Sequence, residues 1–284
     1  MANSARSVLF AIVLATLAFG ASTASGQGIQ NLQINGQEVT ADIVLPGLSA
    51  ELHIVFENAT GLTPANLGLS AQLVNPLDLG LLARLPTITG LLPSSNFPVL
   101  LTLDPPPAST LSMNGVVTVE IYTTDLLYLA GTLLRLYAAT PSGSFEDVTA
   151  WMSSGSFRVG AVHPEFAREH LIVLDPRPVE AVVNQQLTAL ESTLAAQVQT
   201  INPTLWGELD TLLEGVHDEV LADDPEAALE LLDDFSEEVV THSGQDIPDQ
   251  WVAGGSLTNV AGELRANAAR LAFSLQRQAD GGLF

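Results

Sequence analysis

The 284-residue sequence contains no cysteine and no lysine. Without cysteine there is no disulfide bond, thiol nucleophile, Cys-ligated zinc or iron–sulfur cluster. Without lysine there is no P-loop lysine and no Schiff-base chemistry. Only nine basic residues oppose 32 acidic ones, for a net charge of -23. Because phosphate neutralisation requires lysine or arginine, this balance argues against nucleic acid and against anionic membrane surfaces as partners.

The N-terminus has the pattern of a secretory signal peptide. Arg6 precedes an apolar run over residues 8–19, and small residues follow at 20–26. About 12 apolar residues are too few to span a bilayer, which needs ~20. We therefore predict removal of residues 1–26 and export to the periplasm or the extracellular space. The alternative is an uncleaved anchor helix. No later stretch approaches transmembrane length, so no membrane span is expected after removal.

Residues 27–177 have the pattern of short strands. Asn35-Gly36 is a two-residue hairpin signal, and Leu52, Ile54 and Phe56 alternate with polar positions. Several short strands separated by turn signals predict an antiparallel β-sandwich. Further strands are expected at residues 67–74, 97–104, 116–123, 133–139, 156–162 and 170–175.

From residue 178 onward the apolar period becomes helical, and the charge becomes more negative. Four amphipathic segments joined by mostly short links predict a four-helix bundle. Val198 is expected on the inward face of the first helix; Ser256 is the expected cap of the last, with Leu257 inward. Residues 178–284 hold 19 acidic residues and three arginines. The predicted class is therefore α+β, with a β-sandwich domain at 27–177 and an acidic helical bundle domain at 178–284.

Two local stretches resemble known families. Residues 97–103, 136–137, 145–148 and 157–159 together resemble the β-sandwich of ankyrins and netrin receptors. Some relatives there cleave themselves at a His-Phe-Ser step, but residues 163–167 read His-Pro-Glu-Phe-Ala and offer no Ser or Thr nucleophile. Residues 222–228, followed by Leu232 and Phe235, resemble bacterial FIMAH-type helical domains. These resemblances imply an exported bacterial protein of uncharacterised type and no activity.

Paired acids on the predicted helices are the candidate ligands for a cation. They are Asp223, Asp224, Asp233, Asp234 and Glu237. Like charges three or four residues apart destabilise a helix by ~0.2–0.5 kcal/mol each, which a divalent cation or a basic partner would relieve. However, no EF-hand loop is present. A solvated acidic face, a calcium-responsive adhesin-like module and a surface for a cationic partner all remain open.

Residues 76–96 form a long apolar segment without a strand pattern. Only Asp78 and Arg84 are charged within it. We expect a loop that either folds back over the core or exposes an apolar patch to a protein partner. The candidate contact residues are Leu77, Leu79, Leu81, Leu82, Leu85, Ile88, Leu91 and Leu92.

No constellation predicts catalysis directly. The five histidines are scattered, and none lies three to five residues from another. Neither a Gly-x-Ser-x-Gly elbow nor a Ser-x-x-Lys motif is present. We therefore expect no catalytic residue, no bound metal and no cofactor. The sequence favours a non-enzymatic, exported structural or binding protein; the rival hypothesis is a secreted carbohydrate hydrolase that uses two carboxylates.

Overall fold

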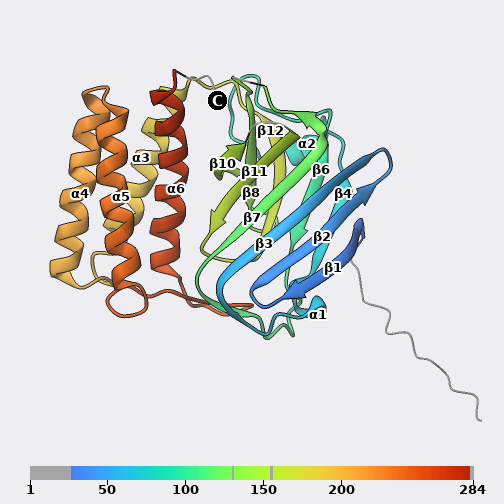
Figure 1. Ribbon diagram of the computed structural model, residues 1–284, viewed down its shortest axis with the longest axis horizontal. Coiled ribbons are helices and arrows are strands. Elements are labelled where there is room, and N and C mark those ends of the chain that lie inside the picture. Colours follow the sequence, from blue (N-terminus) through green and yellow to red (C-terminus); the bar gives the residue numbers. More distant parts are fainter. Residues whose placement is uncertain (1–26, 130, 154–155, 282–284) are drawn as a thin grey trace, which may run out of the picture.

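The computed structural model describes residues 27–129, 131–153 and 156–281 (Figure 1). The predicted signal peptide, residues 1–26, lies outside the described residues. The predicted α+β class is confirmed, because the described chain forms two antiparallel sheets and six helices. The sheets lie beside a group of four long helices, with the last of these helices next to the strands (Figure 1).

The first sheet has seven strands in the order β1-β2-β3-β7-β11-β10, and β13 also pairs with β7. The predicted Asn35-Gly36 turn joins its first two strands, and Gly36 has the positive φ of 64° that such turns require. Leu52, Ile54 and Phe56 are buried as expected. The strands are β1 (Ile29–Asn35), β2 (Glu38–Leu45), β3 (Leu48–Thr60), β7 (Ser112–Leu127), β10 (Thr149–Ser153), β11 (Ser156–His163) and β13 (Gln250–Val252).

The second sheet has six strands in the order β4-β6-β12-β8-β9, with β5 pairing to β12. Apolar residues of both sheets form one buried cluster, which includes Phe56, Phe157 and Phe166. The two sheets therefore share a core. The strands are β4 (Leu69–Leu73), β5 (Leu92–Pro93), β6 (Val99–Leu103), β8 (Leu134–Ala139), β9 (Glu146–Asp147) and β12 (Arg168–Leu174), and the short helix α1 (Pro64–Leu67) precedes β4.

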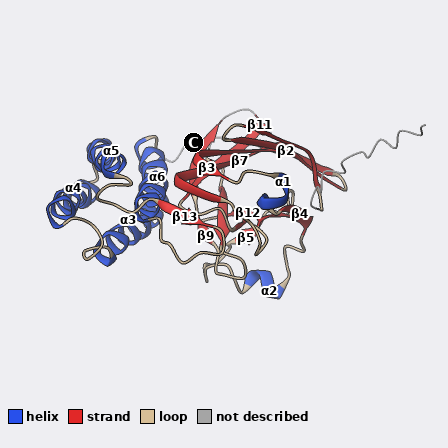
Figure 2. Cartoon of the chain, turned by 90° about the horizontal axis from the view of Figure 1, so that it is seen from below, coloured by secondary structure: helices blue, strands red, loops and turns tan. Residues whose placement is uncertain are grey.

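The segment at residues 76–96 is more ordered than the expected loop. It contains helix α2 (Leu79–Leu82) and strand β5. Asp78 caps this helix by accepting a hydrogen bond from the Leu81 amide at 2.9 Å. Leucines of the segment pack against Tyr137 and Leu171 on the second sheet, in a cluster separate from the shared core. The segment thus covers the outer face of that sheet (Figure 2).

Four long helices follow the strands and bury a core of their own. Two sequence expectations about them are wrong. Val198 is 42% exposed because the first long helix already ends at Ala196, and the last helix is capped by Asn259 rather than Ser256, which leaves Leu257 exposed. The helices are α3 (Val179–Ala196), α4 (Pro203–Leu221), α5 (Pro225–His242) and α6 (Val260–Ala279).

The expectation that the chain is wholly helical after residue 178 is also wrong at one place. Strand β13 returns to the first sheet and pairs with β7, so that Trp251 lies opposite Met113 and joins the core shared by the two sheets. Helix α6, which follows, contacts β7, β10 and β11. Among the described helices, none is long and apolar enough to cross a membrane.

Candidate functional site

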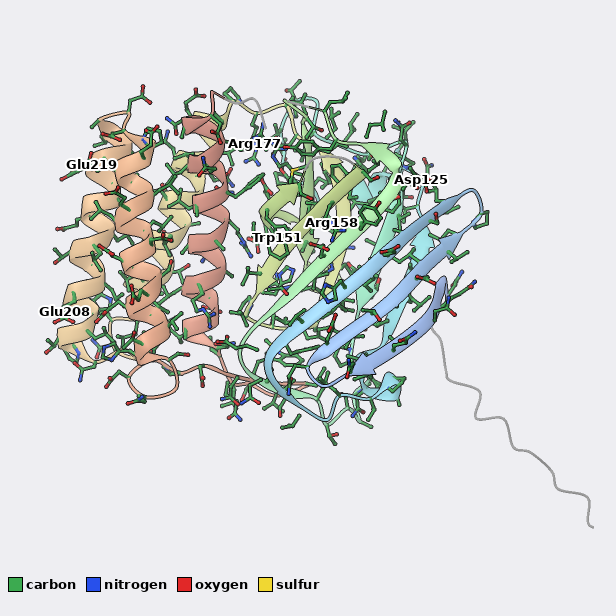
Figure 3. All side chains as sticks on the ribbon, viewed as in Figure 1. Asp125, Trp151, Arg158, Arg177, Glu208 and Glu219 are labelled. Atoms are coloured by element: carbon green, nitrogen blue, oxygen red, sulfur yellow. The ribbon has the colours of Figure 1, made fainter. Side chains whose placement is uncertain are left out.

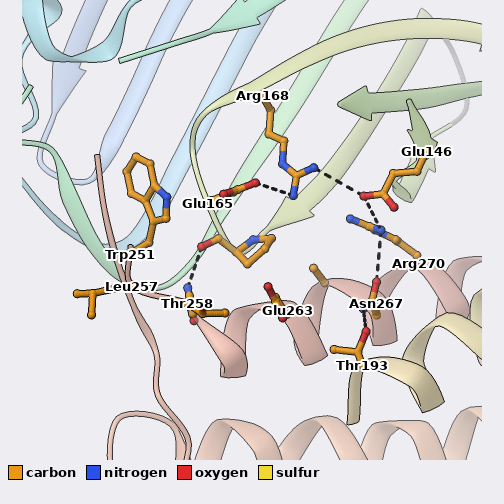
Figure 4. A pocket seen from close by; sticks show the side chains of 13 residues that line it. Glu146, Glu165, Arg168, Thr193, Trp251, Leu257, Thr258, Glu263, Asn267 and Arg270 are labelled. Atoms are coloured by element: carbon orange, nitrogen blue, oxygen red, sulfur yellow. Dashed lines mark hydrogen bonds and ion pairs between the residues drawn. The ribbon is translucent and has the colours of Figure 1, made fainter. Parts of the chain in front are cut away.

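A polar cleft of about 320 Å³ lies where α6 meets the strands (Figure 4). One wall is formed by β9 and by the turn between β11 and β12. The other wall is formed by α6 and the segment that precedes it, and Thr193 of α3 contributes at one end. The lining residues are Glu146, Pro164, Glu165, Arg168, Thr193, Trp251, Leu257, Thr258, Asn259, Glu263, Ala266, Asn267 and Arg270.

Asn259 fixes the two walls to each other. Its side-chain oxygen accepts a hydrogen bond from the Gly262 amide at 2.8 Å, which caps α6. Its side-chain nitrogen donates to the carbonyl oxygen of Pro164 at 2.9 Å and to that of Gly115. Gly262 is required here because a Cβ would lie 2.5 Å from the Asn259 side-chain nitrogen. The cap of α6 therefore also sets the width of the cleft.

Two arginines and two glutamates form a chain of ion pairs across the cleft. Arg168 Nη2 lies 3.0 Å from Glu165, and its Nη1 lies 3.7 Å from Glu146. Arg270 Nη1 lies 3.2 Å from the same Glu146 carboxylate. Arg270 also donates to Asn267 at 3.3 Å. Each guanidinium is therefore held in place by carboxylates of the chain itself.

Glu263 is the exception among the charged residues of the cleft. Figure 4 shows its side chain rising from α6 without any of the interactions drawn for its neighbours, and within the described residues it has no hydrogen bond or ion pair. Burial raises the pKa of Glu263, the charge of Glu165 raises it further, and Arg168 partly opposes the shift. This carboxylate faces both another carboxylate and a guanidinium.

Several buried polar atoms at the cleft and at a smaller cavity beside it have no partner within the described residues. They include Nε of Arg168, Nε of Arg270 and both amide atoms of Gln186. Arg270 is only 7% exposed and Gln186 only 8%, and burial lowers the pKa of Arg270. Gln186 lines a smaller cavity of about 50 Å³, which shares Glu146, Asn267 and Arg270 with the cleft. Since buried polar groups normally have a partner, this region has unused hydrogen-bonding capacity.

A buried charge network lies next to the smaller cavity. Asp175 accepts a hydrogen bond from the Tyr137 hydroxyl at 2.8 Å, and from Arg177 Nε at 2.9 Å. Arg177 lies 3.9 Å from Asp147 and also bonds Gln185 of α3. Burial alone would raise the pKa of Asp175, but the hydrogen bonds and charge of Arg177 lower it overall. The network therefore joins the second sheet to the first long helix.

Two histidines meet in the interior behind the cleft. Nε2 of His163 and Nε2 of His170 lie 2.9 Å apart, both rings are fully buried, and neither Nδ1 has a partner within the described residues. Burial lowers the pKa of His170 to about 3, with a further contribution from Arg168. Burial and the neighbouring His170 likewise hold the pKa of His163 well below its usual value. Both rings are neutral, and one donates its proton to the other.

One family comparison covers nearly all of this architecture. A profile described as a family of unknown function (DUF6689) matches residues 14–279. The chain belongs to this family. No curated protein matches it. The comparisons show neither the expected likeness to ankyrins and netrin receptors nor the expected likeness to FIMAH-type domains.

The apolar segment of the DUF6689 chain divides into covered and exposed residues. Leu81, Leu85 and Leu91 are buried against the second sheet, and Leu82 and Ile88 are partly buried there. In contrast, the remaining three predicted contact residues face solvent: Leu77 is 68% exposed, Leu79 81% and Leu92 42%.

The acidic candidates of the DUF6689 chain lie mainly along α5. Asp224 caps this helix by accepting a hydrogen bond from Ala227 at 3.0 Å, and Asp223 accepts one from Gln278 of α6 at 2.9 Å. Asp233, Asp234 and Glu237 are exposed. In the part of the chain that the structure describes, no three potential ligands are grouped so as to hold a metal ion. Other acids, including Glu208 and Glu219, lie on α4, the helix farthest from the strands (Figure 3).

A second, wider groove lies on another side of the same junction. It has a volume of about 680 Å³ and is lined partly by the aromatic residues Tyr128, Trp151 and Phe273. Trp151 stacks closely over Gly160, where a Cβ would lie 2.0 Å from the indole ring, and its Nε1 donates to Glu120 at 3.1 Å. The junction between strands and helices therefore carries both hollows, and sequence reasoning identified neither.

Proposed function

We propose that the chain is an exported, non-enzymatic binding protein of the periplasm or the extracellular space. In this proposal a β-sandwich domain, residues 27–177, precedes an acidic four-helix bundle domain, residues 178–284. The polar cleft between the two holds the ligand. The separate apolar cores of the sheets and of the helices support the division, and β13 provides a second connection across it.

The observation that carries the proposal is a polar cleft lined by two guanidinium groups and by Glu263, a carboxylate without a partner among the described residues. Its guanidinium groups are positioned by ion pairs, yet the Nε atoms of Arg168 and Arg270 have no partner in the described residues. Those Nε atoms are closed to solvent, so a polar ligand would bind the remaining edges of the guanidinium groups and the Glu263 carboxylate. Small-molecule sites commonly lie at junctions between structural units and have volumes of ~300–1,000 Å³, which the cleft matches at the small end.

The surroundings of the Thr193 hydroxyl favour binding over nucleophilic catalysis at that residue. Thr193 donates to the carbonyl oxygen of Ala189 at 2.8 Å and accepts from Asn267 at 3.0 Å, so its hydroxyl contacts no base. The nearby histidines are buried and bonded to each other. An activated nucleophile needs an adjacent general base, and this geometry does not support one at Thr193.

Thermal melts with four defined probes test the proposal. They are maltose, galacturonate, L-alanine and putrescine, each at millimolar concentration against the purified chain. We expect at least one probe to raise the melting midpoint, because binding to the folded state stabilises it. The shift should disappear in Arg270→Met and persist in Arg265→Met. Arg265 is a matched control because it lies on the same helix and pairs with Glu57 outside the cleft. No shift with any probe, or equal shifts in both variants, would contradict a ligand site here.

A carbohydrate hydrolase is the second candidate, and one observation favours it. Glu165 and Glu263 line the same cleft, and burial together with the Glu165 charge raises the pKa of Glu263. A general acid and an ionised partner require such a difference between two carboxyl groups. Release of reducing ends from a polysaccharide, abolished by both Glu263→Gln and Glu165→Gln, would establish this activity. Its absence across neutral and acidic polysaccharides would leave the binding function.

The exposed acids of α5 support a third proposal, in which calcium or a cationic partner binds that face. The test is a thermal melt with and without millimolar calcium, using the purified chain and the double variant Asp233→Asn/Asp234→Asn. A rise in the midpoint that the variant loses would support calcium binding. An unchanged midpoint would remove the calcium-responsive module from consideration.

A further inference from the structure

We infer that the ligand of the cleft is a small zwitterion of the α-amino-acid type, whose carboxylate binds Arg168 and Arg270 and whose ammonium group binds Glu263 and Glu165. This inference rests on the cleft being the ligand site proposed above. It adds the chemical class of the ligand and the orientation in which the ligand lies.

The anion-binding side of the cleft is defined by two buried guanidinium groups. Arg168 and Arg270 converge on one carboxylate, that of Glu146, at 3.7 and 3.2 Å. Both keep an Nε–H without a partner in the described residues, and Arg270 is 7% exposed. Arginine presents its donors in a planar fork that suits a carboxylate. Both guanidinium groups line the cleft, so a carboxylate supplied by the ligand would meet two cations there; the unpartnered Nε atoms themselves are closed to solvent.

The cation-binding side is defined by two glutamates. Glu165 has one partner, Arg168, at 3.0 Å, whereas Glu263 has none among the described residues. The two carboxylates repel each other, and this contributes to the raised pKa of Glu263. An ammonium group placed between them would remove the repulsion and satisfy Glu263. No other cation in the cleft pairs with Glu263 in the described structure, although Arg168 is close enough to affect it.

Both sides lie within one small space. Figure 4 shows Glu165 and Arg168 on the strand wall, with Glu263 and Arg270 on the opposing helix. A volume of about 320 Å³ limits the ligand to a small molecule. A purely anionic ligand would be repelled by Glu263, and a purely cationic one would be repelled by the two guanidinium groups that line the same space. A molecule with both charges on one short frame satisfies both.

Calorimetric titration of the purified chain with matched ligands tests the inference. The probes are L-alanine, its N-acetyl derivative, which lacks the ammonium group, and its amide, which lacks the carboxylate. The dipeptide alanyl-alanine distinguishes a free amino acid from a peptide, because it separates the two charges. We expect L-alanine to bind, and loss of either charge to weaken binding at least tenfold; binding of alanyl-alanine without L-alanine would overturn the α-amino-acid class. Binding that survives removal of either charge would overturn the inference.

Variants locate each charge. Glu263→Gln and Arg270→Met should each weaken binding of the zwitterion at least tenfold, while Glu237→Gln and Arg265→Met, which lie outside the cleft, should change it less than twofold. A further outcome is that galacturonate or maltose binds while L-alanine does not, and that Arg270→Met removes that binding. This result would refute the zwitterion as the ligand class and would leave the proposed binding function in place. If no probe binds, both fail. The derivative series needs only the wild-type chain, so a variant that does not fold leaves the inference testable.

Discussion

The buried histidine pair makes the free energy of unfolding fall as the pH is lowered, and the size of this fall follows from the pKa values of the two rings. His163 and His170 share one hydrogen bond in the interior and are neutral in the folded state. In the unfolded chain each histidine has a pKa of about 6.5. Unfolding below that pH is therefore coupled to proton uptake. The stabilisation conferred by neutral burial is complete above pH 6.5 and declines as the pH falls toward the folded-state value of about 3 for His170.

The size of the effect follows from the pH interval. A pH of 5 lies about 1.5 units below the pKa of His170 in the unfolded chain. Protonation of His170 at this pH therefore stabilises the unfolded chain by about 2 kcal/mol relative to the folded one. His163 shifts in the same direction and adds to this. The double variant His163→Leu/His170→Leu replaces both hydrogen-bonding partners with apolar groups, so neither is left without a partner. We expect its loss of stability between pH 7 and pH 5 to be smaller than that of wild type by at least about 2 kcal/mol.

Urea unfolding followed by tryptophan fluorescence at pH 7 and pH 5 measures this difference. Comparing wild type with the double variant cancels the contributions of the many acidic side chains, which are the same in both. His217→Gln is the matched control, because His217 is a partly exposed histidine on α4, bonded to Glu191. The double variant should lose less stability than this control as well as less than wild type. Parallel profiles for wild type and the double variant would refute neutral burial of the pair.

Three further substitutions probe the contacts that hold the cleft and its surroundings together. Arg177→Met leaves the Asp175 carboxylate without its buried cation and should lower the free energy of unfolding by about 3–5 kcal/mol in urea titrations; a loss below 1 kcal/mol would mean that the network is solvated. Gly160→Ala places a methyl group 2.0 Å from the Trp151 ring and should cost about 1–3 kcal/mol, with a changed fluorescence spectrum as the ring moves. Trp251→Ala removes the largest side chain of β13 from the core and should lower the free energy of unfolding by about 3–5 kcal/mol. Amide hydrogen exchange in β13 should then become faster; unchanged exchange would argue against packing of β13 on the first sheet.

Local sequence signals predicted most of the regular structure, for identifiable reasons. The hairpin at Asn35-Gly36 has a two-residue turn that requires positive φ, and Gly36 adopts such a φ without strain. The long helices show their apolar faces at a helical period, and Pro203 and Pro225 lie at their first turns as expected. Each of these features is decided by neighbours within a few residues along the chain.

The features that were missed depend on distant partners. Strand β13 has only three residues, too few for a period of two to be recognised, and pairs with β7 more than 130 residues earlier, as in Gln250 with Asn114. The start of α6 was misplaced because Ser256 is an equally good cap by residue type. Asn259 is the actual cap, and it also bonds to the carbonyl oxygen of Pro164 on the opposite wall. No local pattern contains that second requirement.

The cleft itself draws its charged residues from β9, from the β11–β12 turn, from β12 and from α6, so no sequence spacing brings them together. One signal was nevertheless present. Arg270 and Arg277 are seven residues apart on α6, which places them on one face of the helix, beside the apolar positions that were expected to face inward. A guanidinium buried at such a position requires an acceptor from another element. For Arg270 that acceptor is Glu146, at 3.2 Å, whereas Arg277 has no ion pair among the described residues and lines the wider groove. In an acidic chain with so few cations, the inward-facing arginines are better guides to the site than the numerous acids, because only a structural or binding requirement compensates for the free-energy cost of burying them.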